Sequence, residues 1–203
     1  SMDYISVNDD KLLEMAAHGD REAEDQLVSR YNRLVKRCAR PLFLAGGDSE
    51  DLIQEGLMGL LSAVREYDPG SGASFKTYAE LCIKRRLISA VKSASSLKHI
   101  PLNDGVPLED LLSDDSIALL TGAPETSRVL EEQVLARESR SEIARRYSQC
   151  LSKLENQILS LYLDGWSYQE MASFTGKTVK SVDNAVQRIR RKLAHKPRPG
   201  DNS

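Results

Sequence analysis

A short stretch near the C-terminus, residues 167–192, constrains the fold more than any other part of the chain. Ser167 and Glu170 form an S-x-x-E pattern, the capping box that opens an α-helix, so we expect a helix from Tyr168. Gly176 comes about two helical turns later and suits the positive φ that a sharp corner often needs. The pattern predicts two short helices joined by a tight turn.

The second of these helices has an apolar face and a polar face. At helical spacing, the apolar face comprises Val182, Val186, Ile189 and Leu193, and the polar face comprises Lys180, Asn184, Gln187, Arg188 and Arg191. Asn and Gln can bind adenine edges and Arg can bind guanine, which is the chemistry of a helix in the major groove. We interpret the segment as a DNA-binding helix-turn-helix; a solvated amphipathic helix is the alternative. Arg190 and Lys192 are expected only to solvate the end of this helix.

The rest of the chain also shows helical periodicity, and strand patterns are nearly absent. We therefore predict an all-α fold. In the first half, helices are predicted over residues 9–18, 20–38, 49–66 and 74–95. In the second half, helices are predicted over residues 125–150 and after the capping box of Ser152 and Glu155. Residues 197–203 are predicted to be a disordered tail.

Composition excludes several classes of protein. No apolar run approaches the ~20 residues of a membrane span, and the N-terminus does not resemble a signal peptide, so we expect a cytoplasmic protein. The three cysteines, Cys38, Cys82 and Cys150, lie far apart and are expected to be reduced. The three histidines are equally scattered. We expect no metal site, no cofactor and no catalytic residues, and hence no enzyme.

Positive charge is segregated along the chain, although the net charge is −2. One basic cluster comprises Lys84, Arg85, Arg86, Lys92 and Lys98, and another comprises Arg188, Arg190, Arg191, Lys192, Lys196 and Arg198. Residues 103–116 between them contain five acidic residues and no Lys or Arg. Two basic ends around an acidic middle predict two separate contacts with nucleic acid.

Two segments of the chain, each containing one basic cluster or part of it, resemble two regions of the same protein family. DLIQEGLMGLLSAVREYDPGSGASFKTYAELCIKRRLISAV (51–91) resembles region 2 of bacterial sigma factors of the sigma-70 family, and LSKLENQILSLYLDGWSYQEMASFTGKTVKSVDNAVQRIRRKL (151–193) resembles their region 4. The second segment is most similar to the sporulation-type sigma-H branch. The resemblance implies two small helical domains, a region 2 bundle over 1–98 and a region 4 helix-turn-helix over 124–196, joined by an acidic flexible linker over 99–123.

The resemblance also implies an alternative sigma factor, which binds core RNA polymerase and directs it to the −10 and −35 elements of promoter DNA. It assigns core-polymerase binding, on the β′ coiled coil, to Asp51, Gln54 and Glu55. It assigns contact with the −10 element to Phe75, Thr77, Tyr78, Lys84, Arg85 and Lys92. It assigns contact with the −35 element to Lys177, Thr178, Lys180, Ser181, Asn184, Gln187 and Arg188. Region 4 would also dock on the β flap, and an anti-sigma factor is a further partner that the family allows.

Several assignments have structural alternatives. Asp51, Gln54 and Glu55 could simply be solvated, and Phe75 and Tyr78 could pack in the core. Lys84, Arg85 and Lys92 suit phosphate contacts better than base contacts. The chain also has Leu81-Cys82 where housekeeping members carry a Trp pair, so weaker or more sequence-dependent promoter melting is expected.

Two other functions are compatible with a helix-turn-helix. A stand-alone regulator would bind its operator unaided and would need a ligand pocket or a dimerisation surface in the first half. An adaptor that sequesters polymerase would leave the polar face of Asn184, Gln187 and Arg188 without a role. The paired resemblance favours the sigma factor over both.

Overall fold

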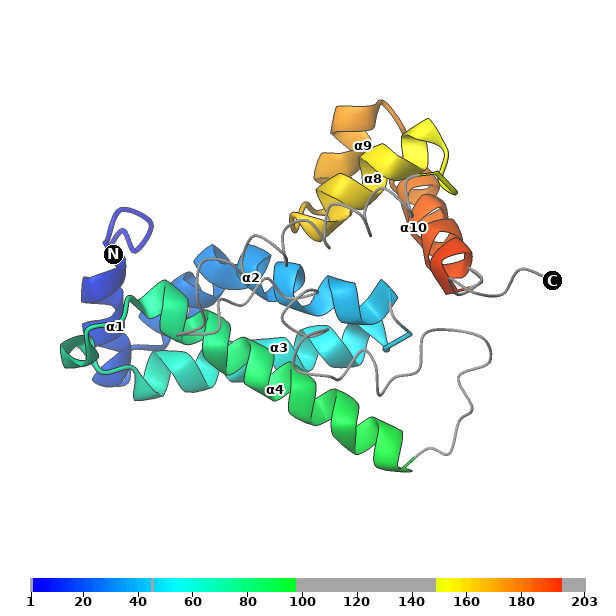
Figure 1. Ribbon diagram of the computed structural model, residues 1–203. Coiled ribbons are helices and arrows are strands. Elements are labelled where there is room, and N and C mark those ends of the chain that lie inside the picture. The colour runs from blue at the N-terminus through cyan, green and yellow to red at the C-terminus, as the bar shows by residue number, and fades with distance from the viewer. Residues whose placement is uncertain (1, 45, 98–148, 195–203) are drawn as a thin grey trace, which may run out of the picture.

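The computed structural model describes residues 2–44, 46–97 and 149–194, and all regular structure in these ranges is helical (Figure 1). The helices are α1 Asp9–Ala17, α2 Arg21–Leu44, α3 Ser49–Glu66, α4 Phe75–Leu97, α8 Lys153–Leu163, α9 Tyr168–Thr175 and α10 Val179–Ala194, with a 3-10 turn at Pro69–Ser71. The predicted all-α fold is confirmed. The predicted linker over 99–123, almost all of the helix over 125–150 and the tail over 197–203 lie outside the described residues.

Local capping explains where the helices begin. The Asp48 carboxylate accepts the backbone N–H groups of Glu50 and Asp51 at 3.0 and 3.2 Å, so α3 begins at Ser49. The Ser152 hydroxyl accepts the N–H of Glu155 at 3.1 Å, and α8 begins directly after it. Both starts agree with the predicted ones.

The α2 helix is longer than predicted and continues past Pro41 to Leu44. A proline inside a helix removes a hydrogen bond and commonly costs about 3 kcal/mol or more. Tertiary packing offsets this cost here, because Leu42, Phe43 and Leu44 are all buried. The helix predicted over residues 20–38 is therefore too short at its C-terminal end, by six residues.

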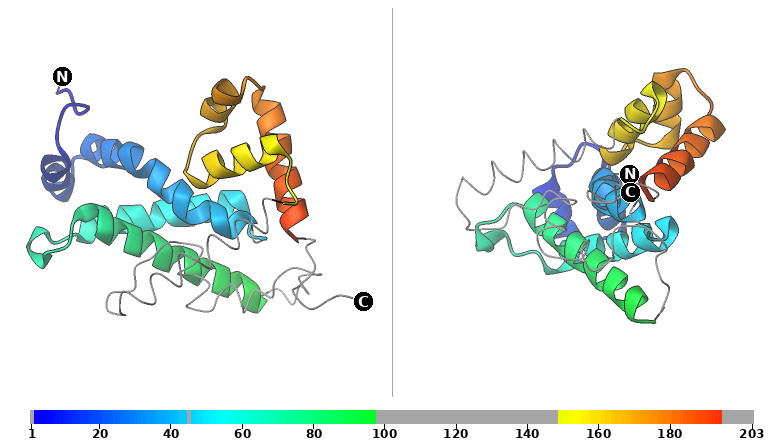
Figure 2. Two further views of the ribbon diagram at one scale, coloured as in Figure 1. Left: turned by 45° about the horizontal axis from the view of Figure 1, so that its top comes forward. Right: turned by 45° about the vertical axis from the view of Figure 1, so that its right-hand side comes forward.

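Two glycines let α3 lie close to its neighbours in the N-terminal unit, which comprises α1–α4. A Cβ atom on Gly59 would lie 2.9 Å from the carbonyl oxygen of Cys82 and 2.9 Å from the Cα of Ile83, both on α4. A Cβ on Gly56 would lie 2.7 Å from the Val35 side chain of α2. The helices α3 and α4 run side by side (Figure 2), and their close contact requires a residue without a side chain at Gly59.

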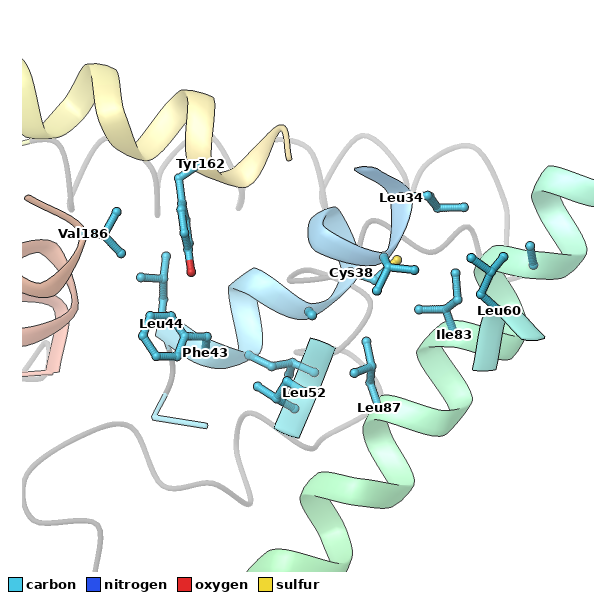
Figure 3. Packing of buried hydrophobic residues seen from close by; sticks show 14 of the residues in the cluster. Leu34, Cys38, Phe43, Leu44, Leu52, Leu60, Ile83, Leu87, Tyr162 and Val186 are labelled. Atoms are coloured by element: carbon cyan, nitrogen blue, oxygen red, sulfur yellow. The ribbon is translucent and has the colours of Figure 1, made fainter. Parts of the chain in front are cut away.

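The C-terminal unit, α8–α10, stands on the C-terminal half of α2, on the side away from α4 (Figures 1 and 2). Phe43 and Leu44 of α2 face Tyr162 of α8 and Val186 of α10 (Figure 3). The rings of Phe43 and Tyr162 are tilted, with centroids 6.5 Å apart. The buried apolar residues of both units therefore form one continuous cluster.

A buried arginine joins the two units at this junction. Arg40 of α2 is 7% exposed, and its Nη1 donates to the carbonyl oxygens of Tyr162 and Trp166, each at 2.7 Å. Its guanidinium carbon lies 4.3 Å from the centroid of the Tyr162 ring. Burial lowers the pKa of Arg40 and raises that of Tyr162. The cation is thus held by an aromatic face and two carbonyls, with no carboxylate needed.

Two further contacts extend the junction. Arg190 of α10 donates from Nη2 to the carbonyl oxygen of Gly47 at 2.9 Å, and its guanidinium lies 4.2 Å from the Phe43 ring centroid. Gly165 has a φ of +87°, and a Cβ there would lie 2.8 Å from the Arg33 carbonyl oxygen. The junction therefore depends on the close approach of Gly165 to the α2 backbone as well as on the cations of Arg40 and Arg190.

Replacing Gly59 with Ala should destabilise the N-terminal unit. Alanine is the better helix former by about 1 kcal/mol, but its Cβ would push against the α4 backbone, and overpacking typically costs about 1–3 kcal/mol. We expect Gly59→Ala to lower the free energy of unfolding in urea, followed by circular dichroism. Ser62→Ala, at an exposed position of α3, is the control and should be neutral or slightly stabilising. A Gly59→Ala variant as stable as this control would contradict the close-approach argument.

Replacing Arg40 with Ala should loosen the junction between the units. The change removes two hydrogen bonds from a charged donor, each worth about 1.5–3 kcal/mol, and leaves two carbonyls without that partner. We expect a larger radius of gyration in small-angle X-ray scattering of the Arg40→Ala protein. Arg37→Ala is the control, because Arg37 is half-exposed and its Nε lies 3.9 Å from Asp164 Oδ1. Equal radii for both variants and the parent would show that Arg40 does not hold the units together.

Candidate functional site

The α9–α10 segment forms the predicted helix-turn-helix. Ser167 Oγ accepts the N–H of Glu170 at 3.1 Å, and Glu170 Oε2 accepts the N–H of Ser167 at 2.7 Å, so the capping box is complete. Gly176 ends α9 with a φ of +67°, the left-handed conformation predicted for the turn. Thr178 then caps α10, because its hydroxyl accepts the N–H of Ser181 at 3.1 Å.

The two faces of α10 are divided as the sequence predicts. Val182, Ala185, Val186 and Ile189 are buried. The opposite face is exposed at Lys180, Asn184, Gln187 and Arg188, and Lys177 and Thr178 are exposed before the helix. Ser181 is half-buried. The structure thus presents amide and guanidinium groups together on one open surface, which can bind base edges in a major groove.

The last turn of α10 is anchored rather than solvated, contrary to expectation. Lys192 Nζ donates to Oε1 of Glu155 in α8, a carboxylate that is 2% exposed. Burial raises the pKa of Glu155, but the hydrogen bonds from Lys192 and Ser152 outweigh it and leave the pKa below its ordinary value. Arg190 contacts Gly47 as described. A lysine 37 positions after an acidic residue gives no local signal, so sequence reasoning missed this anchor.

The predicted core-polymerase residues lie along one side of α3. Asp51 and Gln54 are exposed, and Glu55 is half-buried. Glu55 forms an ion pair between α3 and α4, in which its Oε2 lies 2.6 Å from Nε of Arg86. Sequence reasoning placed Arg86 in a basic cluster and did not foresee that it pairs with α3.

Phe75 lies inside the N-terminal unit, at the start of α4. Its side chain is 6% exposed and makes edge-to-face contacts with Tyr31 and Tyr67, at centroid distances of 5.1 and 5.4 Å. Tyr78 is half-buried, and its ring is tilted against Tyr67 at 5.7 Å. Thr77 is exposed. The structure thus shows the core packing that was one of the two alternatives for Phe75, and a contact with a DNA base would require this packing to change.

Lys84 is buried on α4 and not exposed. It is 5% exposed, and its Nζ lies 2.7 Å from Oε1 of Glu80, one turn earlier in α4. The Lys84 charge is therefore paired with a carboxylate inside the N-terminal unit. Arg85 and Lys92 remain exposed, and Leu81 is 43% exposed one turn before Arg85. Thr77, Leu81 and Arg85 follow each other at four-residue spacing and so share one face of α4.

The structure brings the candidate residues together in three separate surfaces, on α3, α4 and α10. In this arrangement α2 lies between α4 and the C-terminal unit (Figures 1 and 2). Within the described ranges, no three or more His, Cys, Asp or Glu side chains are grouped so that they could hold a metal ion. None of the described helices combines the length and hydropathy of a membrane span.

Comparison with known proteins identifies both units. Residues 27–97 match the family model Sigma-70 region 2, and residues 141–193 match Sigma-70, region 4. The RNA polymerase sigma-H factor of Bacillus licheniformis is 40% identical over 195 residues, covering 94% of this chain and 86% of that protein. The RNA polymerase sigma-H factor of Bacillus subtilis (strain 168) is 38% identical, covering 94% and 88%.

A solved structure, that of the RNA polymerase sigma-H factor from Fusobacterium nucleatum, is 33% identical and matches 70% of this chain and 89% of its own, with a TM-score of 0.27. The family assignment therefore rests on the sequence matches, which cover both helical units. The chain belongs to the sigma-70 family of RNA polymerase sigma factors, as an alternative sigma factor that directs promoter-specific transcription.

Proposed function

We propose that the three exposed surfaces divide the work of a sigma factor between them. The α3 surface binds core RNA polymerase, on the β′ coiled coil, through Asp51, Gln54 and Glu55. The α4 surface contacts the −10 element through Thr77, Tyr78, Arg85 and Lys92. The α10 surface contacts the −35 element through Lys177, Thr178, Lys180, Ser181, Asn184, Gln187 and Arg188.

The polar face of α10 is the observation that carries this proposal. Asn184, Gln187 and Arg188 are exposed on the helix that follows a tight turn, and the apolar face behind them is buried. Amide side chains can bind adenine and arginine can bind guanine, each with two hydrogen bonds. Lys177 and Thr178 precede the first turn of α10, where phosphate contacts are favourable.

The α4 surface is narrower than the sequence implies. Phe75 packs in the core against Tyr31 and Tyr67, and Lys84 is paired with Glu80. Neither is therefore included among the proposed DNA contacts. Arg85 and Lys92 supply charge for phosphates, and Tyr78 is the aromatic side chain with part of its surface accessible for stacking on a base. Leu81 lies beside them where a tryptophan would offer a larger stacking surface.

Simultaneous reading of both elements requires the two units to separate. The −10 and −35 elements lie about two DNA turns apart, roughly 70 Å. The described units instead touch each other through Arg40, Phe43 and Arg190. We infer that these contacts belong to the free protein and are broken when the chain spreads over the polymerase, with region 4 docked on the β flap.

Transcription with purified core polymerase tests the proposed function. We expect the purified chain and core polymerase together to produce defined run-off transcripts from a promoter library, and neither to do so alone. Asp51→Ala and Gln54→Ala should weaken binding to core polymerase and reduce transcript yield. Specific footprints from the chain alone, with no effect on core polymerase, would instead indicate a stand-alone regulator.

Single substitutions in α9–α10 should separate base contacts from phosphate contacts. Gln187→Ala should relax preference at one base pair of the −35 element, at a cost of about 1–3 kcal/mol for the preferred base. Lys177→Ala should weaken binding evenly for all sequences and reduce the salt slope by about 1. Binding of the assembled holoenzyme to −35 variants measures both, with the exposed α8 position in Gln157→Ala as control. A uniform loss for Gln187→Ala would exclude its role in base reading.

A further inference from the structure

Glu55 and Arg86 form an ion pair that connects two surfaces with different proposed partners. Glu55 belongs to the α3 surface that we assign to core polymerase. Arg86 belongs to the basic cluster that the sequence placed on the DNA side. Their Nε and Oε2 atoms lie 2.6 Å apart, and the side chains are 47% exposed for Arg86 and 35% exposed for Glu55.

The close approach of α3 and α4 fixes this pair in place. A Cβ on Gly59, one turn after Glu55, would lie 3.1 Å from the Cβ of Arg86. The Arg86 side chain therefore starts directly beside α3, and its guanidinium reaches back to the carboxylate. Because the α4 backbone lies against Gly59 at Cys82 and Ile83, the Arg86 side chain leaves α4 next to the surface of α3.

Arg85 and Arg86 consequently belong to different faces of α4. Consecutive residues of a helix are separated by about 100°. Arg85 shares the outward face with Thr77 and Leu81, whereas Arg86 is directed across the seam to α3. Two adjacent arginines that look equivalent in the sequence therefore have different neighbours.

Pairing prepares Glu55 for a partner in two ways. A free glutamate side chain has many rotamers, and a binding partner must remove that freedom; the pair with Arg86 removes much of it before binding. A carboxylate can also accept about four hydrogen bonds, and the contact with Nε uses one oxygen, Oε2. In addition, Asp51 lies four residues before Glu55 on the same side, and a cation at Arg86 offsets the repulsion between the two carboxylates.

We propose that Arg86 is a positioning residue for polymerase binding and not a DNA contact. It holds the Glu55 carboxylate in the orientation in which hydrogen-bond donors of core polymerase meet it. The polymerase-binding surface then extends across the seam from α3 onto one residue of α4. This inference rests on the proposed role of Glu55.

Binding of the full chain to purified core polymerase tests the inference. We expect Arg86→Ala to raise the Kd about five- to tenfold and Glu55→Ala to raise it at least as much. The double variant should bind no more weakly than Glu55→Ala, because Arg86 acts through Glu55. Arg86→Lys, which keeps the charge, should recover part of the loss.

Arg65→Ala is the matched control. Arg65 is also an exposed arginine on this unit, and its Nη2 forms an ion pair between helices, 3.2 Å from Oε1 of Glu24. Removing it should leave the Kd for core polymerase unchanged. Binding of the assembled holoenzyme to single-stranded −10 DNA supplies the second readout, in which Arg85→Ala should weaken binding and Arg86→Ala should not. Thermal unfolding of each variant shows whether the fold is retained.

The possible failures are distinguishable. Unchanged polymerase binding by Glu55→Ala would overturn the proposed role of Glu55, and the inference with it. A loss for Glu55→Ala without one for Arg86→Ala would overturn the inference alone. So would an Arg86→Ala effect that persists in the Glu55→Ala background, or a defect in DNA binding equal to that of Arg85→Ala.

Discussion

The close approach of α3 to α4 at Gly59 is the constraint on which the other features of the N-terminal unit depend. With the two backbones in contact, the Ile83 and Leu87 side chains fill the core, and one side of each helix is left for solvent. Asp51 and Gln54 are thereby presented on α3, and Arg85 on α4. A bulkier residue at the crossing would separate the helices and change the angle between two surfaces that we assign to different partners.

The junction between the units combines apolar contact with buried cations. Phe43 and Tyr162 supply apolar surface, while Arg40 and Arg190 donate to backbone carbonyls and lie over aromatic rings. In the separation that we propose, water can replace each of these hydrogen bonds, so the exposed surfaces are less apolar than a core would be. Such a junction suits a contact that must be specific in one state and reversible in another.

Internal pairing reduces the positive charge available to DNA. Lys84 and Glu80, Arg86 and Glu55, and Lys192 and Glu155 are joined within the protein. These three cations are therefore less available to neutralise phosphates, and affinity for DNA depends strongly on the number of phosphates neutralised. This pairing agrees with the proposal that the chain recognises promoter DNA as part of an assembly with core polymerase.

Most helices and their buried faces were predictable from the sequence, because caps, turns and apolar periodicity act over a few residues; the end of α2 was not. The capping boxes of Ser152 and Ser167, the turn at Gly176 and the exposed face of Asn184 and Gln187 all follow from such local rules. Which charged and aromatic residues are buried depends on how the helices pack against one another. The burial of Arg40 and Lys84 comes from packing between helices, and for Phe75 the same packing decides between two alternatives that the sequence left open. For Arg40, the partners lie more than 120 positions away, and no local pattern records such a distance.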